Sequence, residues 1–363
     1  MNCPPKICLS NNKSSLENSI FAEKAILDLL KGGLVKNVSN RPHVVNPLTV
    51  SFNGKGKERL ILDLRHVNKH VRLDKFKFED WKTLKQYINL NSYRFVFDLK
   101  SGYHHVDIHK SFQTYLGFSW ELINVVKYFV FTVLPFGLKS SACIFSKVAR
   151  PLVKFWRSQS IRLVLYLDDG FWVSDNLQLS SRQAIQVKSD LISSGLVPNK
   201  DKSIWAPVQS LEWLGFVWNL TNCTLSVPDR KLFDLQELIS IVLQNCCTIR
   251  ARTLAKVCGK IIAMSPALGH VTQIMTRCMF SVLNEKSHWN QILNIAHKQD
   301  CVSELLFWKS NILKLEPQSL LQKSSSYNLY TDASNSAAAG FIEHFDLVMH
   351  KPWLPSEASK SST

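Results

Sequence analysis

The chain has 363 residues, of which 45% are hydrophobic and 20% are charged, and this balance excludes an intrinsically disordered protein. Its length allows two or three domains with a sizeable core. Lys and Arg outnumber Asp and Glu by 44 to 28, which gives a net charge of +16. This excess indicates a polyanionic partner such as nucleic acid, but charge alone is equally consistent with a generally basic protein that has no specific partner.

Cysteine usage and hydropathy indicate the cellular location of the protein. The nine cysteines include no C-x-x-C pair, and their irregular spacing is more typical of reduced thiols inside a cell than of a disulfide framework. No run approaches the roughly 18 apolar residues of a membrane span, and the first residues lack an apolar leader. We therefore expect an intracellular protein, cytoplasmic or nuclear, that is not secreted and has no membrane partner.

The N-terminal third predicts a helix and a basic hairpin. Residues 1–15 are interpreted as a loose polar lead-in, and a helix is expected to begin at Ser15 and to end at the glycine pair 32–33. A β-hairpin follows, with strands over residues 48–52 and 59–64 and a Gly-Lys turn between them. Its tip carries Lys55, Lys57 and Arg59, which together with Arg65 could bind a triphosphate, while the simpler interpretation is a solvated tip.

Residues 93–99 predict a short strand with one acid, Asp98, at its end. Tyr103 and three histidines, His104, His105 and His109, come next. Histidines this close could indicate zinc, but no further ligand cluster completes a site, so packing and hydrogen bonding are favoured. A second strand over 129–134 enters a turn and a helix over 143–156, whose small first residues let a phosphate approach.

The stretch IRLVLYLDDGFWVS predicts a second hairpin, in which two apolar runs flank Asp168, Asp169 and Gly170. We expect Gly170 to supply the positive φ of the tight turn. Two adjacent carboxylates beside apolar strands repel each other, and a divalent cation such as Mg²⁺ would relieve that repulsion. The alternative for an isolated Asp-Asp-Gly is a solvated turn.

The remaining chain predicts one more hairpin and a helical region. WLGF lies in a hairpin limb over 211–218 with a bend or close contact at Gly215, and a basic loop over 198–202 precedes it. Polar residues 323–326 are interpreted as a linker before two strands. The predicted helices cover 182–193, 232–243, 252–264 and 271–283, and the last two strands cover 327–331 and 337–342.

Taken together, these segments resemble a reverse transcriptase of the retrotransposon type, in particular the DIRS-like and gypsy-like groups. Two segments resemble the strand with the first catalytic acid and the helix that contacts template and nucleotide, VFDLKSGYHHVDI and LPFGLKSSACIF. Three more resemble the Y-x-D-D hairpin, the lysine-bearing loop and the primer grip, YLDDG, GLVPNKDKS and WLGF. RLILDLRHVNKHV resembles the fingers hairpin. Ordered motifs of this kind rarely occur together by accident.

The resemblance implies an α+β fold, the right-hand polymerase with fingers, palm and helical thumb. Fingers and palm are expected over 16–227 and a helical thumb or connection over 228–322. LYTDASNSAAAGFI is similar to the first two strands of a ribonuclease H domain. Residues 327–363 are thus expected to form a truncated ribonuclease H-like segment with one acid, Asp332, and without nuclease activity.

The resemblance also implies an RNA-directed DNA polymerase whose partners are an RNA template, a DNA primer and dNTPs. Asp98 and Asp168 would bridge two Mg²⁺ ions, with Mn²⁺ as an alternative, and Asp169 would be the third acid. Lys202 would give a proton to pyrophosphate or contact phosphate as a surface lysine. In the fingers hairpin, the residues that would neutralise the triphosphate are Lys55, Lys57 and Arg59.

Further roles follow from position in the motifs. Tyr103 would be the steric gate that excludes a 2′-hydroxyl, and Phe136 and Gly137 would contact the nucleotide. The primer grip would comprise Trp213, Leu214 and Gly215. A catalytically decayed nucleic-acid-binding remnant of a retroelement is the main alternative, and an RNA-copying polymerase is disfavoured by the tyrosine and by the Y-x-D-D motif.

Overall fold

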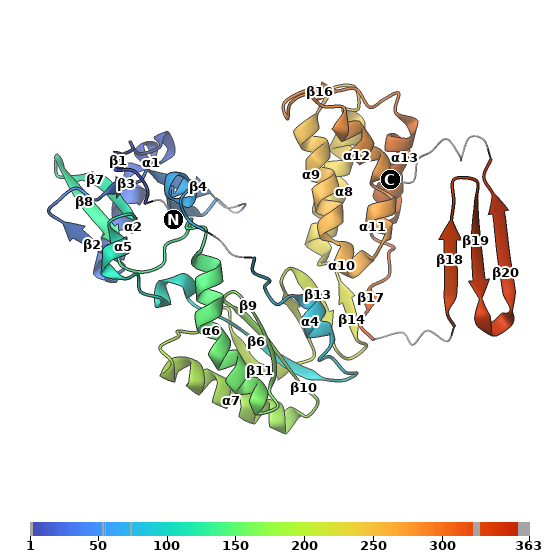
Figure 1. Ribbon diagram of the computed structural model, residues 1–363, viewed down its shortest axis with the longest axis horizontal. Helices are drawn as coiled ribbons and strands as arrows, with labels where there is room; N and C mark the ends of the chain where they lie inside the picture. Colours follow the sequence, from blue (N-terminus) through green and yellow to red (C-terminus); the bar gives the residue numbers. More distant parts are fainter. Residues whose placement is uncertain (1–2, 53, 55, 73–74, 322–326, 355–363) are drawn as a thin grey trace. The chain divides into compact units, whose positions relative to one another are not determined.

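The computed structural model describes residues 3–52, 54, 56–72, 75–321 and 327–354 (Figure 1). The chain forms two compact units, Met1–Leu320 and Leu321–Thr363. Across the described residues, no helix combines the length and the apolar character needed to cross a membrane. The predicted linker 323–326 lies outside the described residues.

The predicted fingers region contains a five-stranded sheet and two N-terminal helices that share one hydrophobic core. The predicted polar lead-in is wrong, because residues 7–8 form an edge strand that pairs in parallel with residues 44–45. Ser15 does not cap a helix but lies buried inside one, and its hydroxyl donates to the Leu48 carbonyl at 2.8 Å. In sheet order the strands are β1 (Ile7–Cys8), β3 (Val44–Val45), β7 (Gly117–Leu122), β8 (Val125–Phe131) and β2 (Val35–Val38), and the helices are α1 (Lys13–Glu17) and α2 (Ser19–Lys31).

The predicted fingers hairpin is present as β4 (Leu48–Phe52) and β5 (Glu58–Leu62). Its second strand ends two residues earlier than expected, and the short helix α3 (Arg65–Asn68) follows. Leu48, Val50 and Leu62 are buried in the fingers core, which fixes this hairpin to the five-stranded sheet.

The predicted palm contains a four-stranded antiparallel sheet against which two long helices pack (Figure 1). The predicted helix 182–193 begins earlier, because Asn176 accepts a hydrogen bond from the Leu179 N–H at 3.0 Å and so caps the first turn. The sheet order is β11 (Ile204–Val208), β6 (Tyr93–Asp98), β10 (Asp169–Ser174) and β9 (Arg162–Tyr166), and the helices are α6 (Ser141–Ser158) and α7 (Leu177–Ser193). Shorter elements nearby are α4 (Trp81–Lys85), the 3₁₀-helix η1 (Gly102–His105) and α5 (Lys110–Gln113).

A small sheet and a helical bundle share one hydrophobic core with the palm. Because this core is continuous, the predicted boundary between palm and thumb at residue 227 stays a prediction. The expected helix over 271–283 is broken by a non-helical Thr276. The sheet order is β12 (Ser210–Trp213), β13 (Phe216–Asn219), β14 (Thr224–Ser226) and β17 (Gln318–Ser319). The helices are α8 (Asp229–Gln244), α9 (Ala251–Ala263), α10 (Ser265–Leu268), α11 (Val271–Ile274), α12 (Arg277–Asn284) and α13 (Gln299–Asn311), beside the ribbon β15 (Ile249–Arg250) and β16 (Ile292–Leu293).

The second unit is an antiparallel meander of three strands (Figure 1). The two strands that the sequence predicts are β18 (Leu329–Ala333) and β19 (Ala337–Ile342). A third strand, β20 (Leu347–Pro352), follows the 3₁₀-turn η2 (Glu343–Phe345) and pairs with β19 along its whole length.

Candidate active site

Two adjacent palm strands carry the predicted catalytic acids. Asp98 is the last residue of β6 and Asp169 is the first residue of β10, and the antiparallel register places them opposite each other. The N–H of Leu99 donates to the Asp168 carbonyl at 2.9 Å, which holds the hairpin tip against the end of β6. Three carboxylates from two distant segments therefore meet at one edge of the sheet.

The hairpin tip is tighter than the sequence suggests. Tyr166 pairs with Asp169, so the loop contains only Leu167 and Asp168. The positive φ of +56° belongs to Leu167, and the prediction for Gly170 is wrong. Gly170 lies within β10, where a Cβ atom would overlap the ring of Phe97. A bulky residue held at positive φ is strained, and such strain gathers at functional sites.

Asp98 is held by the loop of residues 197–203, which we call the Asp98-binding loop. Asn199 Nδ2 donates to Asp98 Oδ1 at 3.0 Å, and Lys202 Nζ donates to Asp98 Oδ2 at 3.1 Å. The Asn199 N–H also donates to the Asp98 carbonyl at 2.7 Å. Lys202, a predicted site residue, is thus beside the acids, whereas Asn199 was missed, and its place in the lysine-bearing motif was its only signal.

Burial and neighbouring charges raise the proton affinity of Asp168 and Asp169. Burial raises the pKa of Asp169 to about 6, and the charges of Asp168 and Asp98 add to the effect. Burial and the charge of Asp98 also raise the pKa of Asp168, while the ammonium of Lys202 opposes both shifts. A second positive charge at this site would stabilise the ionised cluster.

Asp169→Asn is expected to stabilise the metal-free protein at neutral pH. Because the pKa of Asp169 is about 6 when folded and 3.8 ordinarily, the folded state binds this proton more tightly than the unfolded state. The penalty is fully present above pH 6 and fades as the pH falls toward 4. Thermal unfolding in EDTA should give a Tm about 2–4 °C higher for the variant at pH 7.5 and no difference near pH 4. A pH-independent difference would contradict the shift.

The donor set suits a hard divalent cation. Carboxylate oxygens are the ligands that Mg²⁺ and Mn²⁺ prefer, and the three carboxylates carry more negative charge than the single ammonium of Lys202 balances. Within the described ranges, no group of three or more His, Cys, Asp or Glu side chains is arranged to hold a metal ion. The positive group beside Asp98 in this structure is the ammonium of Lys202.

Tyr103 lies beside the acids on η1. A Cβ atom at Gly102 would lie 3.1 Å from the Asp168 Cβ, so the helix packs directly on the hairpin tip. The Tyr103 ring is half-buried against Phe136 and Phe145, at centroid distances of 5.1 and 5.9 Å. Burial, with the Asp168 charge as a smaller cause, raises the pKa of the Tyr103 phenol, which therefore stays neutral.

Phe136 and Gly137 occupy different environments. Phe136 is 48% exposed, and its ring contacts Tyr103 and His104, so it offers an open aromatic face. Gly137 has φ of +98°, and a Cβ atom there would lie 2.7 Å from the Leu62 carbonyl oxygen. Asn68 Nδ2 donates to the Gly137 carbonyl at 2.8 Å. Gly137 therefore joins the fingers hairpin to the start of α6, a packing role that the sequence did not reveal.

The basic tip of the fingers hairpin is only partly described. Lys57 and Arg59 are exposed, and Arg59 lies opposite Ser51 in the ladder. Lys55 lies outside the described residues. Arg65, beyond the hairpin, pairs with Asp63 at 2.6 Å, and that hydrogen bond holds the pKa of the Asp63 carboxyl below its usual range.

The predicted primer grip is a tight hairpin. Leu214 and Gly215 form its two-residue turn, both with positive φ, which is the pattern of a type I′ turn. Lys231 Nζ donates to the Gly215 carbonyl at 2.7 Å and pins the turn to α8. Trp213 is buried against Phe171 of the palm sheet at 5.0 Å, so its side chain anchors the hairpin and cannot contact a primer.

Arg94 connects this hairpin to the palm. It is fully buried on β6, and its Nη2 donates to the carbonyls of Leu211, at 2.9 Å, and of Trp218. The guanidinium lies 5.2 Å from the ring centroid of Phe171. Burial lowers the pKa of Arg94 to about 9.

Asp332 stands apart from these groups. It is exposed on β18 opposite Ala339, and its Oδ1 accepts a hydrogen bond from the Ala333 N–H at 2.9 Å. Its predicted role as a ribonuclease H acid stays a prediction.

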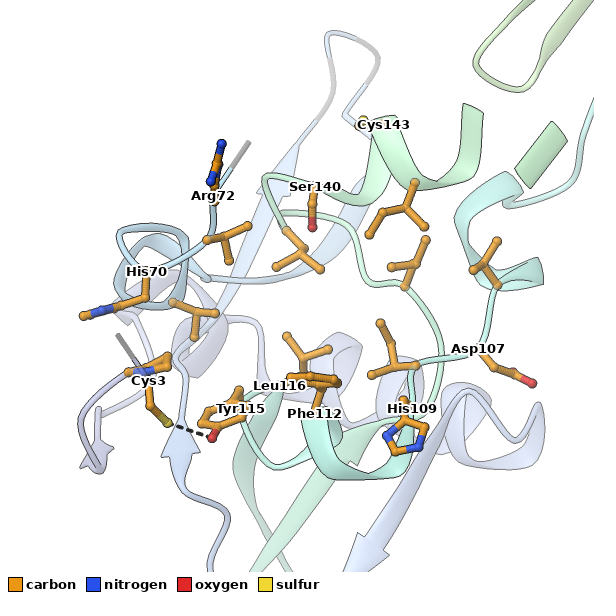
Figure 2. A pocket seen from close by; sticks show the side chains of 18 of the residues that line it. Cys3, His70, Arg72, Asp107, His109, Phe112, Tyr115, Leu116, Ser140 and Cys143 are labelled. Carbon is orange, nitrogen blue, oxygen red and sulfur yellow. Dashed lines mark hydrogen bonds between the residues drawn. The ribbon is translucent and has the colours of Figure 1, made fainter. Parts of the chain in front are cut away.

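A cavity of about 610 Å³ opens beside α3, α5 and the start of α6. Figure 2 shows its mostly apolar walls and the hydrogen bond of 2.8 Å between Cys3 Sγ and the Tyr115 hydroxyl. Its polar lining includes His70, Asp107 and His109. The three predicted catalytic acids do not line this cavity, which is therefore not the place where they could act.

Comparison with known families matches residues 39–218 to the family described as reverse transcriptase (RNA-dependent DNA polymerase). Residues 39–218 are a reverse transcriptase domain. The match begins before the fingers hairpin and ends in β13, so this domain includes the three acids, Tyr103 and the Asp98-binding loop.

Relatives of the reverse transcriptase domain are viral and transposon polyproteins. An enzymatic polyprotein of Cassava vein mosaic virus is 20% identical over 85% of this chain and 44% of its own length. The retrovirus-related Pol polyprotein from transposon gypsy of Drosophila melanogaster is 28% identical over 60% of this chain and 21% of its own length. The chain thus spans less than half the length of these curated relatives.

Solved structures show the same fold. The foamy viral protease-reverse transcriptase in complex with an RNA/DNA hybrid matches with a TM-score of 0.69 and 18% identity, over 98% of this chain and 45% of that chain. The same viral protein in complex with dsDNA matches with a TM-score of 0.69 and 18% identity, over 99% of this chain and 71% of that chain. The mixed α and β polymerase fold predicted from the sequence is confirmed.

Proposed function

We propose that the chain is an RNA-directed DNA polymerase of a retroelement. It would transfer nucleotides from dNTPs to the 3′-hydroxyl of a DNA primer on an RNA or DNA template. The observation that carries this proposal is the cross-strand pairing of Asp98 with Asp169 inside a reverse transcriptase domain, with Asp168 in the loop between β9 and β10. The net charge of +16 supports a nucleic-acid partner.

The reaction forms a bond between the primer O3′ and the α-phosphorus, releases the proton of the 3′-hydroxyl to solvent, and breaks the bond from that phosphorus to pyrophosphate. Two Mg²⁺ ions, or Mn²⁺ in their place, would supply positive charge at the entering and leaving oxygens. Asp98, Asp168 and Asp169 would hold these ions, and Asn199 would keep the Asp98 carboxylate oriented.

Lys202 has two tasks in this proposal. Its ammonium balances Asp98 before substrate binds, and the side chain is 66% exposed, so it can turn toward a leaving pyrophosphate and give it a proton. Lys57 and Arg59 would neutralise the triphosphate from the fingers, where both side chains are exposed.

Tyr103→Ala is expected to admit ribonucleotides. The aromatic ring lies between Phe136 and Phe145 on a helix packed against Asp168, where it would clash with a 2′-hydroxyl. The ratio of kcat/KM for a dNTP to that for the matching rNTP should fall about tenfold or more. Tyr103→Phe keeps the ring and should keep the ratio. Unchanged discrimination in the alanine variant would place the gate elsewhere.

Primer extension tests the proposed function. The full chain is mixed with an RNA template annealed to a labelled DNA primer, and dNTPs and Mg²⁺ are added under single-turnover conditions. We expect stepwise extension that EDTA stops. Tight binding of the primer-template without extension in Mg²⁺ or Mn²⁺ would contradict the polymerase and would favour the nucleic-acid-binding remnant.

The second unit has a separate proposal. We propose that this segment has a ribonuclease H-like fold, on the support of the β18–β19–β20 meander in its described residues, 327–354, and of Asp332 on the first strand. An intracellular location, cytoplasmic or nuclear, likewise remains our proposal from the cysteine pattern.

A further inference from the structure

His105 connects two segments that both contact the catalytic acids. It is the last residue of η1, the helix that carries Tyr103 and packs on Asp168 through Gly102. Its Nε2 accepts a hydrogen bond from the N–H of Val197 at 3.1 Å, and Val197 is the first residue of the Asp98-binding loop. The two residues lie 92 positions apart in the chain.

The geometry requires one tautomer of this histidine. An N–H cannot donate to a protonated ring nitrogen, so Nε2 carries no hydrogen and Nδ1 carries the proton. Nδ1 lies 3.0 Å from the Gly102 carbonyl oxygen and donates to it. The ring is therefore fixed at both nitrogens, with one bond inside η1 and the other to the Asp98-binding loop.

The start of the loop is also held from the other side. The Lys100 N–H donates to the Val197 carbonyl at 2.8 Å, and Leu99 forms a bridge with Pro198. Two residues after Val197, Asn199 binds both the carboxylate and the carbonyl of Asp98. The position of Val197 thus sets where Asn199 meets Asp98.

We propose that His105 is a positioning residue that sets the Asp98-binding loop relative to the helix carrying Tyr103. The proposal rests on the polymerase function proposed above. Through the Asp98-binding loop, His105 sets the position of Asp98. Through η1, it sets the position of the Tyr103 ring, which would exclude a 2′-hydroxyl. Displacing either group by about 1 Å is enough to cost a large factor in rate.

Loss of the His105 imidazole should change the geometry of the site more than the stability of the fold. Val197 is 51% exposed, and a single hydrogen bond of a partly exposed group makes only a small net contribution to the free energy of unfolding. Removal of the imidazole should therefore leave the palm folded, so a change in activity would not reflect unfolding.

The test compares His105→Leu with His105→Gln. Leucine fills a similar space without either hydrogen bond, whereas glutamine places an amide oxygen where it can accept from the Val197 N–H. We expect His105→Leu to lower kcat for dNTP addition about tenfold and to lower the dNTP-to-rNTP selectivity several-fold, with little change in the Kd for primer-template. His105→Gln should recover most of both losses.

His109→Leu is the matched control. This histidine follows η1 but bonds to Ser111 within its own turn, so its loss should change neither kcat nor selectivity. Amide exchange of the full chain gives a readout independent of catalysis, because the Val197 N–H should exchange faster in His105→Leu than in the other variants.

The outcomes separate the two proposals. Absent extension by the wild-type chain would defeat the polymerase, whatever the exchange data show. An active wild type with an unchanged His105→Leu variant would defeat the positioning role, as would equal losses in the leucine and glutamine variants or unchanged exchange at Val197.

Discussion

Asp168→Asn is expected to lower the rate of primer extension by at least about 10³-fold without unfolding the protein. The amide keeps the size of the side chain but removes the charge that would hold a divalent cation. Asp168 lies at the strained tip of the β9–β10 hairpin, and burial and the charge of Asp98 already raise its pKa. The Tm in EDTA should therefore not fall.

The measurement is single-turnover extension of a labelled primer on RNA, with circular dichroism for the fold. Asp234→Asn serves as the control, because Asp234 is an exposed acid on α8 that the site does not use. Near-normal extension by Asp168→Asn would remove this residue from the catalytic assignment. An equal loss in Asp234→Asn would point to overall charge instead.

Gly170→Ala is expected to destabilise the palm by about 3 kcal/mol and to abolish extension. A Cβ atom at this position would overlap the ring of Phe97, which is itself buried in the palm core. Neither β10 nor β6 can shift without moving Asp169 or Asp98, which these two strands carry. Stability and activity should therefore be lost together.

Urea unfolding gives the free energy of unfolding for this comparison, and Gly259→Ala is the matched control. Gly259 is exposed within α9, and among the described residues no atom outside the local helix lies within 4 Å of the place that an added methyl group would take. Alanine there should raise stability by about 0.5–1 kcal/mol through helix propensity. A Gly170→Ala variant as stable as the wild type would show that the β6–β10 contact is looser than the structure has it.

Strand β6 and the β9–β10 hairpin could be predicted because short apolar runs lie next to carboxylates in both segments. Residues 93–97 and 163–166 are rich in β-branched and aromatic side chains, and both lie in the palm sheet. The pairing of β6 with β10, however, was expected only from the family resemblance, since no local sequence pattern indicates that these two strands are neighbours.

Long-range contacts explain what the sequence did not predict. Gly170 was assigned a turn role because Asp-Gly is typical of turns, but the reason for glycine is Phe97, which lies far away in the chain. Asn199 forms a hydrogen bond with Asp98, which lies 101 positions earlier in the chain. The helix expected over 271–283 breaks at Thr276, where Glu304 of α13 accepts the Met279 N–H at 2.8 Å and so stabilises a new helix start.

The most direct test of the central claim, one metal centre built from two distant strands, is cleavage by bound iron. Fe²⁺ in place of Mg²⁺, with ascorbate and peroxide, produces radicals that cut the backbone beside the ion. We predict cuts near both Asp98 and Asp168, suppressed by excess Mg²⁺ and lost in Asp168→Asn. Cuts near only one of these segments, or cuts that Mg²⁺ does not suppress, would contradict the shared site.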